Sequence, residues 1–294
     1  MNQRTRPLLA LLGMSLIWGY GWTVLKFGLL DAEPFDFNAA RMSLSTLCLF
    51  LLVLVTGRPL RPKRVPELII LGLGQTTLLF TFSTWAIDSG NVGRVAFLVY
   101  TMPLFTVVLA WPFLGERIHG FQWVSVFLAT FGLILLVRPW ENSGSWLGNT
   151  LSVGAGITWA VGAIMIKRFQ KKEPMDLISM TAWQMAFGTI PLLFLAWYIP
   201  ETPIVWSSRF IFMLAIISIA MTAAGWCLWI YALDRLDAGT ASLGTLIAPI
   251  IAVVTAAIHF GELPLISDVF GMAAIATALL TLSLHTMRDM KPTK

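Results

Sequence analysis

The chain has 294 residues, of which 57% are hydrophobic and only 12% are charged. The charged share is about half that of a soluble domain, and no soluble core could shelter so much apolar surface, so lipid must solvate much of the chain. The net charge of +5 does not indicate nucleic-acid binding, because the basic residues lie in short segments between apolar runs. Cys48 and Cys227 lie in separate apolar runs, which excludes a disulfide framework and a zinc site.

The apolar runs predict an all-α membrane protein. The first run, from Leu8 to Leu30, is too long for the core of a cleaved signal peptide, so we expect it to be retained as a span. Since about 20 apolar residues cross the hydrocarbon core as a helix, the sequence predicts ten transmembrane helices. Their expected ranges are 7–30, 35–56, 66–87, 93–113, 120–138, 147–169, 176–198, 208–233, 238–260 and 265–286.

The basic residues predict the orientation of these spans. Lys26 and Arg41 lie within spans. With the N-terminus inside, only Arg94, Arg138 and Arg209 fall in outer segments, and the remaining fifteen Lys and Arg fall in inner ones. Because basic residues concentrate on the cytoplasmic side, both termini are expected in the cytoplasm. A multi-pass protein of a bacterial inner (plasma) membrane is the expected location.

The two halves of the chain resemble each other. The matched positions, which lie 140 to 146 residues apart, are Trp18 and Trp159, Lys26 and Lys167, Glu33-Pro34-x-Asp36 and Glu173-Pro174-x-Asp176, Ala86 and Ala232, Pro103 and Pro249, and Gly115-Glu116 and Gly261-Glu262. Five spans per half is an odd number, so the second half must enter the membrane from the opposite side. We therefore predict two five-helix inverted repeats, residues 1–144 and 145–294, a design that recurs in secondary transporters.

Several of these segments carry a family resemblance. The segment Pro103 to Arg117, its partner Pro249 to Glu262 and the pair Trp18-Gly19 resemble the EamA branch of the drug/metabolite transporter superfamily. The resemblance covers essentially the whole chain and implies a ten-helix fold that transports small molecules, often by exporting amino acids or related metabolites. The sugar-phosphate branch is less similar, because the ninth span has no Lys-Arg pair. The small multidrug branch carries a carboxylate in its first span, which this chain lacks.

The aromatic and weakly polar residues near mid-membrane predict a binding cavity between the halves. The expected lining is Trp18, Trp22, Gln75, Phe80, Tyr100, Trp159, Thr222, Trp226 and Thr245. Such a lining suits a neutral or zwitterionic solute with an apolar side chain. The alternative is that these aromatics only pack between helices or against lipid. Pro103 and Pro249 are expected to loosen their helices at matching depths and to act as hinges.

The charged residues within the spans leave more than one interpretation. Lys26 and Lys167 either extend to the interface or attract an anionic group. Arg41 lies roughly 9 Å into its span, so we expect a carboxylate partner or a water-filled vestibule, and its role is either a structural clamp or a contact with the substrate. The candidate partners are Asp31, Glu33, Asp36 and Asp88. Glu116 and Glu262 are expected to fasten helix ends to neighbouring helices, with proton coupling as the alternative.

The motifs of enzymes are not found in the sequence. It contains no metal-spaced cluster, no phosphate-binding loop and no nucleophile elbow, so no enzyme, metal or cofactor is expected. We expect a secondary transporter that exports or exchanges small amphipathic metabolites, most of all amino acids with aromatic ones favoured, by alternating access. A multidrug or nucleoside exporter and a solute channel remain alternatives. The expected partners are a small-molecule substrate and the bilayer; the oligomeric state is open, and a monomer is compatible with the sequence.

The orientation can be tested with single cysteines. A cysteine placed at Ser143 should react with an impermeant thiol reagent added to intact cells, whereas one at Lys171 should not, because the charge pattern puts these loops on opposite sides. Both should react in opened membranes, which provides the control. The reverse labelling pattern would overturn the orientation.

Overall fold

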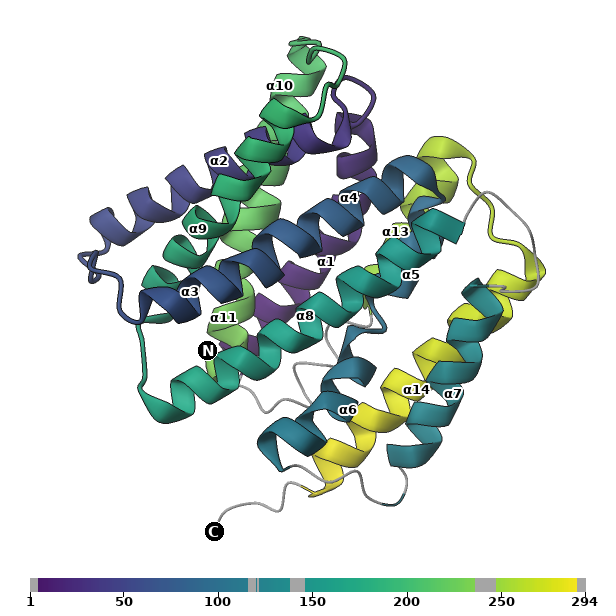
Figure 1. Ribbon diagram of the computed structural model, residues 1–294. Coiled ribbons are helices and arrows are strands. Elements are labelled where there is room, and N and C mark those ends of the chain that lie inside the picture. Colours follow the sequence, from purple (N-terminus) through teal and green to yellow (C-terminus); the bar gives the residue numbers. More distant parts are fainter. Residues whose placement is uncertain (1–4, 116–119, 121, 138–145, 236–246, 290–294) are drawn as a thin grey trace.

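The computed structural model describes residues 5–115, 120, 122–137, 146–235 and 247–289, and every element in these ranges is a helix (Figure 1). The α-helices are α1 (Thr5–Gly28), α2 (Pro34–Val55), α3 (Val65–Gly72), α4 (Leu79–Ser89), α5 (Val92–Val99), α6 (Met102–Leu114), α7 (Gln122–Val137), α8 (Trp146–Lys172), α9 (Leu177–Tyr198), α10 (Ser208–Ala215), α11 (Gly225–Arg235), α13 (Ile247–Phe260) and α14 (Ile266–Asp289). Two π-helical segments, η1 (Leu73–Leu78) and η2 (Ile216–Ala224), join α3 to α4 and α10 to α11.

Seven helical segments are long and apolar enough to cross a membrane. They are Leu9–Gly28, Pro34–Val55, Val65–Ser89, Val92–Leu114, Trp146–Lys172, Leu177–Tyr198 and Ser208–Trp229. Three shorter apolar helices, Trp123–Leu135, Ala248–Phe260 and Ile266–Ala278, fall within the other three expected spans. Part of the expected span 238–260 lies outside the described residues. The chain is thus an integral membrane protein, as the sequence predicts.

The outer surface of the bundle is apolar. Phe127, Trp197 and Ile258, on three different helices, are 70%, 80% and 73% exposed. A water-soluble protein rarely carries large contiguous patches of such side chains, because they drive aggregation. In a bilayer the same side chains meet lipid chains, and the helices need only satisfy their own backbone groups.

Three expected spans are interrupted as α-helices. The third contains η1 and the eighth contains η2, and these segments begin at Leu73 and Ile216, which are 143 residues apart. The fourth breaks at Tyr100 and Thr101, where α5 ends and α6 begins. A π-helical turn shifts the hydrogen bonds by one residue, and such turns are frequent at functional sites.

The two prolines expected to act as hinges lie in the first turns of described helices. Pro103 is the second residue of α6, so the chain has already broken at Tyr100 and Thr101 before it. The expectation that Pro103 loosens an unbroken helix is therefore wrong, because a proline in the first turn removes no helical hydrogen bond. Pro249 is the third residue of α13, and residues 236–246 before it lie outside the described residues. The hinge role of both prolines stays a prediction.

The helices pack in close pairs. α2 lies along α9, α7 along α14, and α4 with η1 along α8 (Figure 1). α3 and α9 approach each other closely at Gly72 and Gly188. A Cβ atom on Gly188 would collide with the backbone oxygen of Gly72 and with the side chain of Thr76. Small residues permit such approaches between membrane helices, which are held by packing rather than by the hydrophobic effect.

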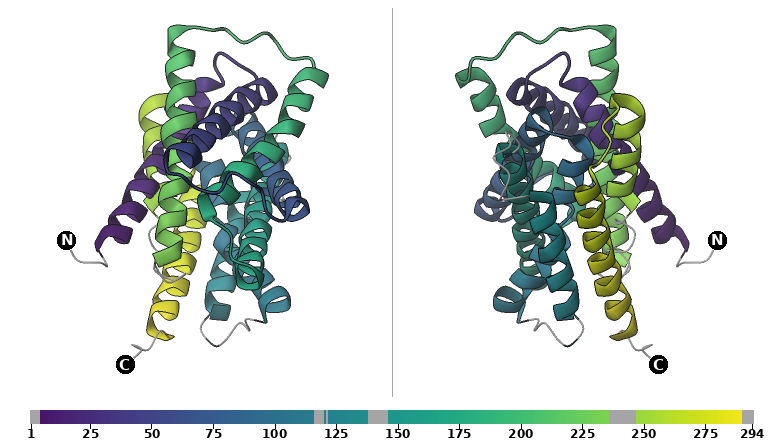
Figure 2. Two further views of the ribbon diagram at one scale, coloured as in Figure 1. Left: turned by 90° about the vertical axis from the view of Figure 1, so that its left-hand side faces the viewer. Right: turned by 90° about the vertical axis from the view of Figure 1, so that its right-hand side faces the viewer.

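The linker between α9 and α10 crosses one end of the bundle (Figure 2). Glu201 in this linker accepts hydrogen bonds from the backbone N–H groups of Phe35 and Asp36 at 3.1 and 2.8 Å. The first turn of α2 is thereby capped from another segment, since its own N-cap residue, Glu33, caps no N–H and bonds to Thr202 instead. Partial burial raises the pKa of the Glu201 carboxyl, and the two N–H donors act in the opposite direction.

Two ion pairs fasten helix ends. Arg209 of α10 donates bidentately to Asp31, which follows α1. Lys26 of α1 pairs with Glu262, which follows α13, and Glu262 also accepts the N–H of Val92 at the start of α5. Glu262 thus fastens helix ends as the sequence predicts; Glu116 lies outside the described residues.

The tight packing of α3 on α9 can be tested with alanine. Gly188→Ala should destabilise the protein by about 1–3 kcal/mol, because the added methyl group forces two backbones apart. Gly74→Ala is the matched control, since a Cβ atom there meets nothing within 4 Å. Thermal unfolding in detergent, followed by size-exclusion chromatography, measures both variants. Equal melting temperatures would contradict the assigned packing.

Candidate functional site

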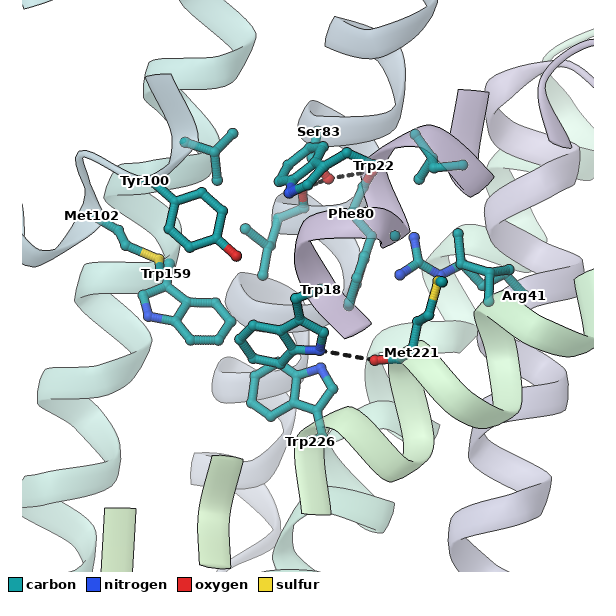
Figure 3. Close-up of a pocket in the computed structure, with 15 residues that line it drawn as sticks. Trp18, Trp22, Arg41, Phe80, Ser83, Tyr100, Met102, Trp159, Met221 and Trp226 are labelled. Atoms are coloured by element: carbon teal, nitrogen blue, oxygen red, sulfur yellow. Dashed lines mark hydrogen bonds between the residues drawn. The ribbon is translucent and has the colours of Figure 1, made fainter. Parts of the chain in front are cut away.

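A pocket lies among the helices of both halves (Figure 3). Its space, including the open mouth, is about 690 Å³. Its lining comes from α1, α2, α4, α5 and α6 of the first half and from α8, η2 and α11 of the second. The lining residues are Trp18, Gly21, Trp22, Leu25, Arg41, Leu79, Phe80, Ser83, Val99, Tyr100, Met102, Trp159, Ile217, Met221 and Trp226.

Tryptophans from three helices form one wall of the pocket. The ring centroid of Trp18 lies 5.6 Å from that of Trp159 and 6.0 Å from that of Trp226, and the last two are 5.1 Å apart. Trp229 adds to the cluster, 6.2 Å from Trp18. Edge-on and tilted contacts at these distances stabilise aromatic pairs beyond the apolar area they bury. The cluster therefore couples α1 of the first half to α8 and α11 of the second.

The π-helical segment η2 holds Trp18 in place. The N–H of Gly225 bonds to the carbonyl oxygens of Ala220 and Thr222 and not to that of Met221, its usual acceptor four residues back. The Met221 oxygen instead accepts the indole N–H of Trp18 at 2.9 Å (Figure 3). Gly225 also leaves the room that the indole needs, because a Cβ atom there would collide with its nitrogen.

The opposite part of the lining is aromatic and carries one charge. Tyr100, at the break between α5 and α6, contacts Trp22 edge-on with centroids 6.4 Å apart. Arg41 of α2 lies across the pocket from Tyr100 (Figure 3). Its guanidinium carbon is 4.6 Å from the ring centroid of Phe80, and its Nε donates to the hydroxyl of Thr222 at 3.0 Å.

The carboxylate partner expected for Arg41 is wrong. None of the described carboxylates forms an ion pair with it, and Asp31 binds Arg209 instead. Asp31 and Glu33 precede α2, at the end of the bundle, whereas Arg41 is the eighth residue of that helix. The expected vestibule fits better, because Arg41 is only 8% exposed and lines the pocket.

Six of the nine expected binding residues line the pocket: Trp18, Trp22, Phe80, Tyr100, Trp159 and Trp226. Thr222 lies behind Arg41, and Gln75 is buried against Gly162 with its amide donating to the Trp159 carbonyl at 3.3 Å, so neither reaches the lining. Thr245 lies outside the described residues. That these residues bind substrate stays a prediction.

Sequence reasoning missed several lining residues. Ser83 and Met221 face the pocket, yet nothing in the sequence separates them from ordinary residues of an apolar helix. Arg41 stood out as a charge within a span, which could have placed it in the cavity. Among the described residues, no group of three or more His, Cys, Asp or Glu could hold a metal ion.

An all-helical membrane bundle with an aromatic pocket between its halves has the architecture of a membrane transporter. The EamA-like transporter family matches the chain twice, over residues 5–138 and 146–284, and the chain belongs to this family. It is therefore a membrane transporter of the drug/metabolite class.

Two relatives and one solved structure illustrate the similarity. The uncharacterized transporter YoaV of Bacillus subtilis is 24% identical over 93% of this chain and 95% of its own length. A probable amino-acid metabolite efflux pump of Escherichia coli is 28% identical over 88% of each chain. A crystal structure with 16% identity matches with a TM-score of 0.70 over 98% of this chain and 99% of the other, which shows that the fold is shared.

Removing aromatic side chains from the pocket lining should impair transport. Trp18→Ala, Tyr100→Ala and Trp226→Ala should each lower solute uptake by about tenfold without loss of expression, since each deletes an aromatic surface of the pocket. Trp197→Ala is the matched control, because Trp197 is 80% exposed on the outer surface. Uptake by proteoliposomes with equal amounts of protein measures the effect. Normal uptake by all three pocket variants would show that the pocket is not the transport site.

Proposed function

We propose that this protein exports or exchanges small amphipathic metabolites, amino acids above all and aromatic ones in particular, by alternating access. The observation that carries the proposal is the pocket between the halves, where Trp18, Trp159 and Trp226 offer flat apolar surfaces and Arg41 offers a charge. An aromatic pocket with few polar groups suits a solute with an apolar side chain. The relative named a probable amino-acid metabolite efflux pump supports the same substrate class.

We also propose that the chain has ten spans in two five-helix inverted repeats, residues 1–144 and 145–294. Support comes from the seven long and three shorter apolar helices. The helix contacts are paired as well: α2 packs on η2 as α9 packs on η1, and α1 packs on α13 as α8 packs on α5 and α6. In an inverted repeat each contact has such an equivalent, and a site between the halves can open to either side in turn.

The charge pattern assigns the two ends of the bundle. The excess of Lys and Arg in one set of loops supports placing both termini in the cytoplasm and the protein in a bacterial inner membrane. The contacts of Lys26 with Glu262 and of Glu201 with α2 then lie at the outer end. Helices joined there have to separate when the pocket opens outward. The break at Tyr100 and Thr101, followed by Pro103, provides a point where α5 and α6 can reorient.

The small-molecule substrate and the bilayer are the partners that the pocket and the apolar surface accommodate. Cationic drugs fit the pocket poorly, because its lining carries an arginine and, among the described residues, no carboxylate. Like charge disfavours a cation beside a buried guanidinium.

Counterflow in liposomes tests the proposal. Purified protein in liposomes loaded with unlabelled tryptophan should transiently concentrate external labelled tryptophan, because a carrier exchanges one molecule for another. Phenylalanine and leucine should also exchange, and protein-free liposomes are the control. Simple equilibration without concentration would indicate a channel, and movement of nucleosides or lipophilic drugs with no amino acid would refute the substrate class.

A further inference from the structure

Arg41 is the one charged side chain among the described residues that line the pocket. It lies in the eighth position of α2, roughly 10 Å from the start of the helix, and is 8% exposed. A charge at this depth is costly unless a partner compensates it, and intramembrane charges face cavities or substrate pathways for this reason. The charge of Arg41 at this depth therefore requires a compensating partner.

The contacts of Arg41 occupy only part of its guanidinium. Nε donates to the Thr222 hydroxyl, which itself donates to the carbonyl oxygen of Ile217 at 2.8 Å, so the Thr222 oxygen is oriented to accept. Phe80 covers one face of the guanidinium, with its ring centroid 4.6 Å from the central carbon. The two terminal nitrogens have no hydrogen-bond acceptor among the described residues and point into the pocket (Figure 3).

This arrangement differs from that of the structural arginines in the same chain. Arg58, Arg64 and Arg209 each pair with a carboxylate of the protein, namely Asp176, Glu67 and Asp31. Arg41 has hydrogen-bonding and aromatic partners that fix its orientation but, among the described residues, none that neutralises its charge. A planar guanidinium held in this way presents a two-pronged site whose geometry matches a carboxylate.

We propose that the terminal guanidinium nitrogens of Arg41 bind the carboxylate of the transported solute, while the Trp18, Trp159 and Trp226 wall holds its apolar body. The proposal rests on the proposed function and narrows it. The site selects solutes that combine one carboxylate with an apolar or aromatic group, and it rejects amines and amides of the same shape. Thr222 acts as a positioning residue, since it contacts Arg41 from behind and does not line the pocket.

Competition against labelled tryptophan in proteoliposomes tests the selectivity of the wild-type protein. Unlabelled tryptophan should compete at least tenfold better than tryptophanamide or tryptamine, since only tryptophan offers a carboxylate for a charge-assisted hydrogen bond. Equal competition by all three would overturn the role of Arg41 and leave amino-acid transport standing.

Variants at Arg41 test the residue itself. Arg41→Gln should raise the KM for tryptophan by about tenfold or more and should abolish the preference for tryptophan over tryptophanamide, which a purely structural role would not do. Arg41→Lys keeps the charge without the two-pronged geometry, so it should retain the preference with a raised KM. Thr222→Val should raise KM by a smaller factor and retain the preference. The matched control is Arg58→Gln, which removes a guanidinium that pairs outside the pocket and should leave KM and preference unchanged.

Two further outcomes distinguish failure of the carboxylate-binding role of Arg41 from misfolding of a variant and from failure of the proposed function. If Arg41→Gln does not fold, Arg41→Lys decides, and a lost preference in a well-folded Lys variant contradicts the proposal. If the wild type moves no amino acid, the proposed function fails. Thermal stabilisation in detergent then tests carboxylate binding by Arg41 alone. Indole-3-acetate should raise the melting temperature of the wild type but not of Arg41→Gln, and tryptamine should raise neither. Stabilisation by tryptamine would refute carboxylate binding by Arg41.

Discussion

Hydrocarbon offers no hydrogen-bond partner to a peptide group, so the protein itself must satisfy each N–H and C=O within the bilayer. Continuous α-helices meet this requirement over most of the described residues, and two departures from them, η2 and the break at Tyr100, contribute to the pocket lining. In η2 the shifted bonding of Gly225 releases the Met221 oxygen, and the Trp18 indole takes it up across the interface between the halves. The helix irregularity and the position of the pocket wall are therefore consequences of one constraint.

The same constraint gives the polar side chains of the interior their roles. Thr222 bonds back to Ile217 in η2 and presents its oxygen to Arg41. At the end of the bundle, Glu201 supplies the acceptors that the first turn of α2 lacks. Arg209 is neutralised by Asp31, as in a structural ion pair. Arg41 faces the pocket, as a residue that receives a ligand would.

The candidate site was partly predictable. Trp18 and Trp22 are four residues apart on one helix face, and Trp159 follows Trp18 by the repeat, so their convergence could be anticipated. Gln75 and Thr222 were expected in the lining because they are polar and lie near mid-span, yet Gln75 bonds to the Trp159 carbonyl of α8 and Thr222 bonds to Ile217 of its own segment and to Arg41. A sequence gives the depth of a residue along its helix, whereas the rotation of the helix about its axis depends on packing, as at Gly162 and Gly225.

The sequence by itself determined that this chain is an α-helical membrane protein, where seven of its long apolar helices lie to within a few residues and which family it belongs to. Apolar run length and local turn chemistry carry that information, and neither needs a partner from elsewhere in the chain. Only the tertiary structure decided the partner of Arg41, the break at Tyr100 before Pro103 and the π-helical turns. Each depends on contacts between residues far apart in the chain, such as Arg41 with Thr222 and Trp18 with Met221, which no local pattern encodes.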